Sequence, residues 1–146
     1  MGTFPRNRSA QAPRLLDTQL LLWLAVTPTR LPPALRSDLS DRRTPFLFSV
    51  ASLWEVAIKT SLGKPAFQVD AGQLRGGLRQ QGLEEVAITA DHCLAVQHLP
   101  WIHRDPFDRL LVAQAIEAGL TLLTADRILS GYGSQVVWVG SAGSGG

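Results

Sequence analysis

The amino-acid sequence predicts an α/β protein, a three-layer α/β/α sandwich with a central, mostly parallel sheet. Short apolar runs of strand length alternate along the chain with longer segments of helical periodicity. Strands that alternate with helices through short connections form parallel sheets covered on both faces. The length of 146 residues fits one domain that can bury a core without disulfides or metals. With 45% hydrophobic and 18% charged residues, the composition is that of a globular protein.

The first part of the chain supplies two strands and three helices. The run “RLL” (14–16) predicts a brief buried strand, and “TQLLLWLAV” (18–26) predicts the helix that follows it. The segment “TPTRLPP” interrupts the pattern, and “ALRSDLSDR” (34–42) predicts a second, more polar helix. The apolar “PFLFS” (45–49) predicts the next strand. It leads into the helix “SLWEVAIKTSL” (52–62), which the following glycine is expected to end.

The second part continues the alternation. A polar helix is expected around “DAGQLRGGLRQQ” (70–81), followed by the strand “EVAIT” (85–89) and the helix “ADHCLAVQHL” (90–99). A further helix is expected from Pro106 to about Ala118, with a glycine as its stop. The chain closes with two expected strands, “LTLLT” (120–124) and “QVVWV” (135–139).

Both ends of the chain are predicted to be flexible, a leader at 1–13 and a tail at 140–146. The N-terminal segment lacks the apolar stretch of a secretory signal. The longest apolar runs, such as 20–26, are far too short to span a bilayer. A lone Cys93 cannot form an internal disulfide, which favours a reducing environment. We therefore expect a cytoplasmic protein with no membrane contact.

The charge of the chain permits a nucleic-acid ligand without requiring one. The formal net charge is only +2, yet twelve of the fourteen basic residues are arginine. Arginine suits planar, two-pronged contact with phosphate. A GC-rich genome would produce the same bias.

Acidic residues follow two of the expected strands. Asp17 comes directly after 14–16, and Asp126 comes two residues after 120–124. Parallel sheets place their functional groups at the carboxyl ends of the strands. If these strands are neighbours, their backbones lie roughly 4.8 Å apart and both carboxylates face one crevice. Each aspartate could instead be an ordinary helix cap.

Two further carboxylates lie in the first turns of expected helices. Glu55 follows Ser52 by three residues, the spacing of a capping box, although apolar residues surround it. Asp105 precedes Pro106 and is the natural N-cap of its helix. Asp108 then falls at the third helical position, where it could simply complement the helix dipole. Capping therefore accounts for Asp105 and leaves Asp108 without a necessary structural role.

The α/β layout would bring four carboxylates to one rim, those of Asp17, Glu55, Asp108 and Asp126. Like charges in a small pocket raise each other's pKa and destabilise the fold. A hard divalent cation resolves this repulsion, and Mg²⁺, or alternatively Mn²⁺, is the natural occupant. No His/Cys cluster has zinc-ligand spacing. We assign the three histidines to the surface or to packing: His92, His98 and His103.

Four segments carry a family resemblance: “LLDTQLLLWL”, “SVASLWEVAIKTSLGK”, “LPWIHRDPFDRLLVAQAIEAGLTLLTAD” and “YGSQVVWV”. They span about residues 14–139 and resemble the PIN domain of VapC-type toxins. The block “HRDPFDRLLVAQA” is the most specific part of the resemblance. Gln19 departs from the pattern, because relatives often have histidine after “DT”, and this puts substrate detail in doubt more than chemistry.

The resemblance implies a metal-dependent endoribonuclease, the toxin half of a bacterial or archaeal toxin–antitoxin pair. It implies an RNA substrate, a homodimer, and a small antitoxin whose tail occupies the acidic groove. By motif, the acidic residues of the family fall on the same four positions, Asp17, Glu55, Asp108 and Asp126. Asp105 belongs to a subgroup pattern and is assigned to capping or to support of the site.

The mechanism expected from this resemblance is metal-assisted, in-line hydrolysis of an RNA phosphodiester bond. Asp17 and Asp108 are the best candidates for direct metal ligands. Glu55 and Asp126 would act through bound water or position the nucleophile. Side chains beside the acids could contact the substrate or, for the arginines, form local ion pairs instead: Thr18, Thr124, Arg104, Arg109 and Arg127.

Three other functions compete with this interpretation. An aspartyl-phosphate phosphatase with Asp17 as nucleophile needs a second aspartate two residues later, where this chain has Gln19. A phospho-receiver or other non-catalytic binding module with an acidic pocket is a second alternative. A receiver needs a lysine after a late strand, and none follows “LTLLT” or “QVVWV”. A housekeeping PIN nuclease in RNA processing is the nearest alternative, and the compact length favours the toxin.

Overall fold

The computed structural model describes residues 12–41 and 43–142. Most of the predicted leader (1–11) and the end of the predicted tail (143–146) lie outside the described residues. The described strands form one sheet in the order β4-β3-β2-β5-β6, and every pairing is parallel. The strands are β2 (Arg14–Leu16), β3 (Phe46–Ser49), β4 (Glu84–Val86), β5 (Thr121–Thr124) and β6 (Val136–Trp138).

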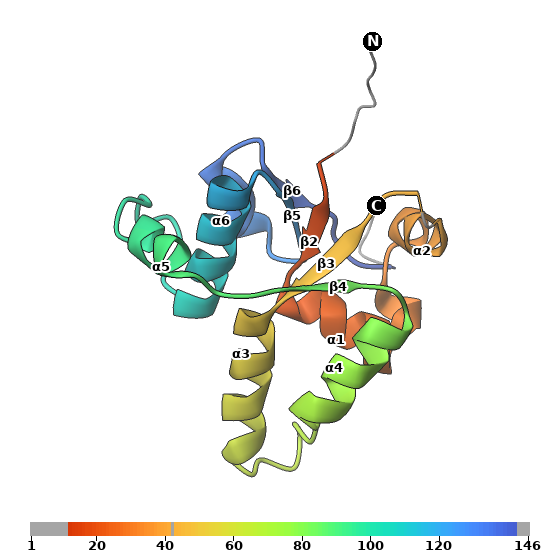
Figure 1. Ribbon diagram of the computed structural model, residues 1–146. Coiled ribbons are helices and arrows are strands. Elements are labelled where there is room, and N and C mark those ends of the chain that lie inside the picture. The colour runs from red at the N-terminus through yellow and green to blue at the C-terminus, as the bar shows by residue number, and fades with distance from the viewer. Residues whose placement is uncertain (1–11, 42, 143–146) are drawn as a thin grey trace.

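Helices cover both faces of this sheet, which confirms the predicted α/β/α sandwich (Figure 1). The α-helices are α1 (Thr18–Val26), α2 (Pro33–Ser40), α3 (Val50–Ser61), α4 (Ala71–Gln80), α5 (Ala90–Val96) and α6 (Pro106–Ala118). Two short 3-10 helices, η1 (Pro28–Arg30) and η2 (Arg127–Tyr132), were not predicted, since they are too short to show apolar periodicity. Within the described chain, no helix has both the length and the apolar character needed to cross a membrane.

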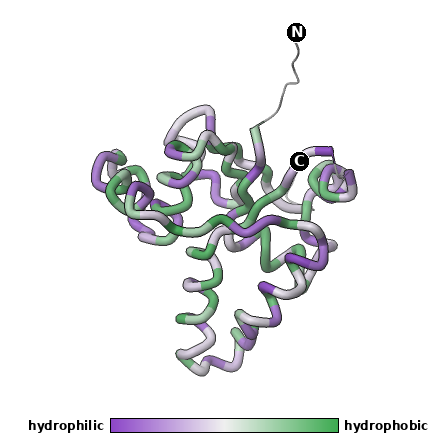
Figure 2. Tube along the Cα trace, in the orientation of Figure 1, coloured by the Kyte–Doolittle hydropathy of each residue, from purple (hydrophilic) through white to green (hydrophobic). Residues whose placement is uncertain are grey.

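The strands divide their side chains between two apolar clusters. Leu16 and Leu123 point into a cluster with α1, α2 and α4, whereas Leu15 and Leu122 point into a cluster with α6 and η2. This alternation follows from the period of two in a strand. Hydrophobic residues accordingly run along the central strands, and hydrophilic ones are frequent on the outer helices α2 and α4 (Figure 2). Both faces of the sheet are therefore buried.

The third predicted strand and the helix after it differ from expectation at their ends. The strand expected at 85–89 occupies Glu84–Val86, and the helix expected at 90–99 ends at Val96. In each case a side chain of α6 forms hydrogen bonds with main-chain carbonyls near the point where the strand or helix ends. Gln114 Nε2 donates to the carbonyl of Ala87, and Arg109 donates to the carbonyls at the end of α5. These contacts join residues that are far apart in the sequence, so local sequence patterns do not predict them.

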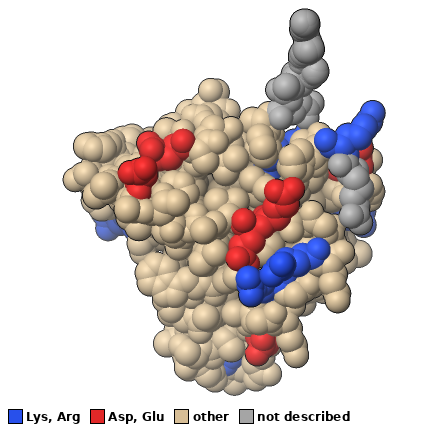
Figure 3. All heavy atoms as spheres, in the orientation of Figure 1, with Lys and Arg blue, Asp and Glu red and all other residues tan. Residues whose placement is uncertain are grey.

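Charged side chains lie over the edge strand β4 (Figure 3). Glu84 and Glu85 are exposed there, and Glu85 forms an ion pair with Arg75 of α4, with 2.6 Å between Nε and Oε1. An unpaired strand edge is a template for association with another chain, and charge is a common protection against it.

The order of the strands fixes where a site can form. The chain runs from the central strand β2 outward to β3 and β4, then returns to the other side of β2 as β5 and β6. The direction of travel reverses between β2 and β5, and ligands bind at such a switch point, beyond the carboxyl ends of the strands. The main chain already joins the two strands there, because the amide of Asp17 donates to the carbonyl of Leu123 at 3.0 Å.

We predict that Leu111→Ala destabilises the protein far more than Ile116→Ala. Leu111 is fully buried between α6 and the sheet, whereas Ile116 on the same helix is 43% exposed. Removing the buried side chain leaves a cavity and should cost about 2–5 kcal/mol, measured by urea unfolding. The Ile116 variant should cost less than about 1 kcal/mol. Equal costs at the two positions would contradict this packing.

Candidate active site

All four predicted acidic residues line one pocket of about 570 Å³ at the carboxyl ends of β2 and β5. The acidic side chains that line it are Asp17, Glu55, Asp105, Asp108 and Asp126. They come from four different parts of the fold: the start of α1, the middle of α3, the start of α6 and the start of η2. The sheet topology therefore brings together acids that are far apart in the sequence, as expected.

Asp17 is both a helix cap and a pocket residue. Its Oδ1 accepts from the amide of Leu20 at 2.8 Å and caps α1. Its Oδ2 accepts from Thr124 Oγ1 at 2.6 Å and from the amide of Ala125 at 2.9 Å. The residue is only 3% exposed, and this burial raises the pKa of its carboxyl, although the hydrogen bonds work in the opposite direction.

Asp126 is also both a cap and a pocket residue. It begins η2, where its Oδ1 accepts from the amide of Ile128 at 3.0 Å. Its Oδ2 lies 2.8 Å from Nε2 of His103. Thr124 links it to Asp17, because the threonine hydroxyl accepts from the amide of Asp126 at 2.9 Å while it donates to Asp17. One threonine therefore fixes the spacing of two acids.

Asp105 caps α6 as the sequence predicted, and Asp108 has no capping role. Asp105 is the N-cap of α6, and its Oδ1 accepts from the amide of Asp108 at 3.0 Å. No donor among the described residues hydrogen-bonds the carboxylate of Asp108; the nearest charged partner is His103, with Nε2 3.7 Å from Oδ2. Burial raises the pKa of Asp108 to about 7, helped by the negative charges of Asp105, Asp17 and Glu55.

The expected capping box of Ser52 and Glu55 is wrong. Helix α3 starts at Val50, and its N-cap is Ser49, whose Oγ accepts from the amide of Ala51. Glu55 therefore lies beyond the first turn of the helix and cannot cap it. Ser52 instead accepts a hydrogen bond from Thr18 Oγ1 at 2.8 Å.

Glu55 lines the pocket and has one buried oxygen atom without a hydrogen-bond partner among the described residues. The residue is 6% exposed, and its Oε2 forms an ion pair with Lys59 Nζ at 2.8 Å. Its Oε1 is buried and has no hydrogen-bond partner among the described residues. A buried, unpaired carboxylate oxygen is costly, and a bound cation or water molecule would offset that cost. Lys59 also lines the pocket, and sequence reasoning did not single it out.

The residues expected to contact substrate have different environments. Thr18 and Thr124 are both buried. Thr18 donates to Ser52 and joins α1 to α3, whereas Thr124 donates to Asp17 and supports that acid. Arg127 is exposed on the rim of the pocket, with its guanidinium carbon 5.5 Å from the ring centre of Trp138. Arg104 is exposed but does not line the pocket.

Arg109 occupies a structural position that argues against the expected phosphate contact. It is 4% exposed and donates to the carbonyls of Val96 and Pro100 and to the hydroxyl of Tyr132. Its guanidinium carbon lies 4.0 Å from the ring centre of Trp101. The side chain therefore joins α6 to the end of α5 and is not free to reach a ligand.

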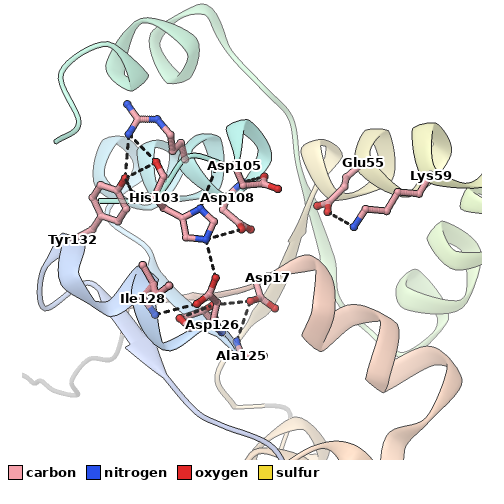
Figure 4. A network of polar contacts seen from close by, with 12 residues as sticks. Asp17, Glu55, Lys59, His103, Asp105, Asp108, Ala125, Asp126, Ile128 and Tyr132 are labelled. Carbon is pink, nitrogen blue, oxygen red and sulfur yellow. Dashed lines mark hydrogen bonds and ion pairs between the residues drawn. The ribbon is translucent and has the colours of Figure 1, made fainter. Parts of the chain in front are cut away.

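His103 is, like Lys59, a residue of the site that sequence reasoning missed. Its Nε2 contacts Asp126 and approaches Asp108, and candidate ligand atoms of these three residues lie within 4.8 Å of one another (Figure 4). The expected surface or packing role is therefore incomplete. The one local signal is the position of His103 two residues before the cap of α6, where its Nδ1 accepts from the amide of Asp105. Its contact with Asp126 spans 23 residues and leaves no sequence pattern.

The donor chemistry of the pocket fits a hard divalent cation. The acids supply oxygen atoms, which Mg²⁺ and Mn²⁺ prefer in proteins. The unpaired Oε1 of Glu55 and the carboxylate of Asp108 are the two groups that most need a positive partner. A cation bound in the pocket would relieve the repulsion that raises the pKa of Asp108.

Solved structures of toxin–antitoxin complexes contain chains with a similar fold. One is the VapBC2 complex of Rickettsia felis with promoter DNA (15% identity, TM-score 0.66, covering 88% of this chain and 98% of that chain). Another is DNA-bound VapBC from Salmonella typhimurium (13%, 0.62, 88% and 97%). A third is VapBC-5 from Mycobacterium tuberculosis (16%, 0.59, 88% and 98%). At these identities the likeness concerns the fold.

Comparison with curated proteins gave no significant match. A sequence model of the PIN domain matches residues 14–134. PIN domains are generally nucleases that use divalent metals, and a pocket lined by acidic side chains agrees with that chemistry. Because the match covers most of the chain and both layers of helices, this protein belongs to the PIN domain family.

Proposed function

We propose that this protein is a Mg²⁺-dependent endoribonuclease, the VapC-type toxin of a toxin–antitoxin pair. The observation that carries the proposal is the single pocket that Asp17, Glu55, Asp108 and Asp126 share. Membership of the PIN domain family and similarity in fold to chains of VapBC complexes support it. The antitoxin, a homodimeric state and a cytoplasmic setting belong to the same proposal.

The hydrogen bonds indicate which acids would hold the cation. Asp108 and Oε1 of Glu55 have no donor among the described residues, so we place them in direct contact with it. Asp17 has a lone pair left on Oδ1 only, because its Oδ2 already accepts two hydrogen bonds. Asp126 has donors on both oxygens and is suited to orienting a water molecule. When bound, Mg²⁺ would lower the pKa of a water molecule and offset charge on the scissile phosphate.

The other groups of the pocket would bind and orient the substrate. Lys59 and Arg127 are the positively charged residues that line the rim, and a phosphodiester backbone is attracted to such groups. Thr124 keeps Asp17 and Asp126 at a fixed separation. In this arrangement the acidic residues form the centre of the site, and the positively charged side chains of Lys59 and Arg127 lie at its edge. RNA would lie across this rim.

We expect Asp108→Asn to abolish Mg²⁺-dependent RNA cleavage while the fold stays intact. Loss of the acid whose carboxylate accepts no hydrogen bond among the described residues should lower the rate by about 100-fold or more, measured on end-labelled RNA. Circular dichroism would report the fold, and Asp91→Asn, an exposed acid of α5 outside the pocket, is the matched control. Full activity of Asp108→Asn, or of the wild type in excess EDTA, would overturn the metal-dependent mechanism.

Induced expression separates the toxin from a housekeeping nuclease. The wild-type chain should arrest bacterial growth, and Asp108→Asn should not, because the variant lacks the proposed cleavage. Co-expression of a cognate antitoxin should restore growth. Cleavage in vitro without any effect on growth would favour a housekeeping nuclease and contradict the toxin.

The raised pKa of Asp108 predicts a stability effect that depends on pH. Between pH 3.8 and about 7 the folded carboxyl stays protonated while the unfolded one is charged. Folding stability from this group is therefore lost as pH rises through that window, by up to about 4 kcal/mol in the metal-free protein. Asp108→Asn should exceed the melting temperature of the wild type by more at pH 8 than at pH 5, both measured in EDTA.

The same measurement with Mg²⁺ tests the cation. Because the metal binds the charged carboxylate, Mg²⁺ should stabilise the wild type more at pH 8 than at pH 5. It should stabilise the variant little at either pH. A difference between the two proteins that does not change with pH would contradict the proposed electrostatics.

A further inference from the structure

We propose that His103 is a positioning residue, locked with its proton on Nε2, that holds Asp126 in the pocket and stays outside the coordination shell of the cation. The proposal rests on the proposed function. Candidate ligand atoms of His103, Asp108 and Asp126 lie within 4.8 Å of one another, so the position of His103 alone would also suit a metal ligand. The hydrogen bonds of its ring distinguish the two roles.

The two ring nitrogens of His103 face different kinds of partner. Nδ1 accepts from the amide of Asp105 at 3.0 Å. Nε2 faces carboxylate oxygens, with Asp126 Oδ2 at 2.8 Å and Asp108 Oδ2 at 3.7 Å (Figure 4). A main-chain N–H can only donate, so Nδ1 must be the unprotonated nitrogen of the ring. The proton of the neutral imidazole is then on Nε2, where an ionised carboxylate can accept it.

This tautomer is the opposite of the one that a metal ligand needs. A histidine that binds a metal through Nε2 usually donates its Nδ1–H to a carboxylate or a carbonyl. Here Nδ1 faces the amide of Asp105, which cannot accept a hydrogen bond. Binding a metal through Nε2 would therefore cost the contact with Asp105 as well as the contact with Asp126. Nε2 is a donor to Asp126, and the ligands of the cation are oxygen atoms.

The main chain of His103 is fixed independently of its ring. Its amide donates to the hydroxyl of Tyr132 at 3.0 Å, and its carbonyl accepts from Nη1 of Arg109 at 3.4 Å. Arg109 and Tyr132 also contact each other, at 3.1 Å. These residues come from α6 and η2, the elements that carry Asp108 and Asp126 at their starts. The imidazole is therefore held in place before any ligand arrives.

The carboxylate of Asp126 is therefore held by two donors whose own positions are fixed. The amide of Ile128 holds Oδ1, and the ring of His103 holds Oδ2. Without the imidazole, Asp126 would keep one donor and could rotate out of the pocket, since its side chain is 38% exposed. Asp126 would then orient a water molecule of the cation less well, and loss of an outer-shell partner typically weakens metal affinity 10–100-fold.

The tautomer can be tested on the metal-free protein. Long-range ¹H–¹⁵N spectra of the ¹⁵N-histidine-labelled chain in EDTA at pH 8 should show His103 with its proton on Nε2. The His103→Gln variant assigns the signal by removing it. A proton on Nδ1 would overturn the proposal, because the lone pair of Nε2 would then be open to a metal. This outcome does not depend on nuclease activity.

Matched variants test the positioning role through Mn²⁺ binding, followed by electron paramagnetic resonance. His103→Gln keeps a side-chain N–H near the place of Nε2 and should bind Mn²⁺ within about threefold of the wild type. His103→Asn keeps only a group near the place of Nδ1 and should bind 10–100-fold more weakly. His98→Asn, an exposed histidine of the same loop region, is the control and should bind as the wild type does. Equal affinity of the Asn and Gln variants would overturn the positioning role.

The spin-echo modulation of bound Mn²⁺ separates failure of this inference from failure of the proposed function. We expect no directly coordinated nitrogen. A nitrogen coupling that is lost in His103→Gln would overturn the inference and leave the metal site in place. A wild-type protein that binds no Mn²⁺ would overturn the proposed metal site, and the positioning of Asp126 for a cation with it.

Discussion

Repulsion among carboxylates that separate elements hold at one end of the sheet is the constraint on which the rest of the site depends. The order β3-β2-β5 brings the starts of α1, α3 and η2 together, and α6 adds Asp108. Asp17 and Asp126 tolerate this crowding because amides and a hydroxyl or an imidazole donate to them. Asp108 has no such donor among the described residues, and burial together with the neighbouring negative charges raises its pKa. The pocket is therefore arranged for a positive ligand before one binds.

Capping and chemistry are compatible roles for the same side chain. Asp17, Asp105 and Asp126 each cap a helix, and each lines the pocket. A cap fixes the side chain at the first turn of a helix, and after a parallel strand this turn lies at the functional edge of the sheet. Helix capping and the acidic lining of the pocket therefore depend on one geometry. Arg109 also has two roles, because it joins α5 to α6 and donates to the main-chain carbonyl of His103.

The features set by local rules could be predicted from the sequence, and those set by distant contacts could not. Asp105, Pro106 and Gly119 define α6 because capping, proline and left-handed glycine act within one turn, and Gly119 has φ 68°. Glu55 lines the pocket, as expected, but the expected start of its helix at residue 52 is wrong by two residues. The buried strand β3 passes directly into α3 at Ser49. The roles of His103 and Arg109 depend on partners in η2 and α5, which a single sequence does not reveal.

The location of a bound metal tests the shared acidic pocket most directly. Anomalous diffraction from crystals of the full chain grown with Mn²⁺ would place the ion without reference to activity. We predict a peak in the pocket, in contact with oxygen atoms of Asp108 and Glu55, while the ring of His103 still contacts Asp126. Absence of a peak there at saturating Mn²⁺, or a peak ligated by Nε2 of His103, would contradict this prediction.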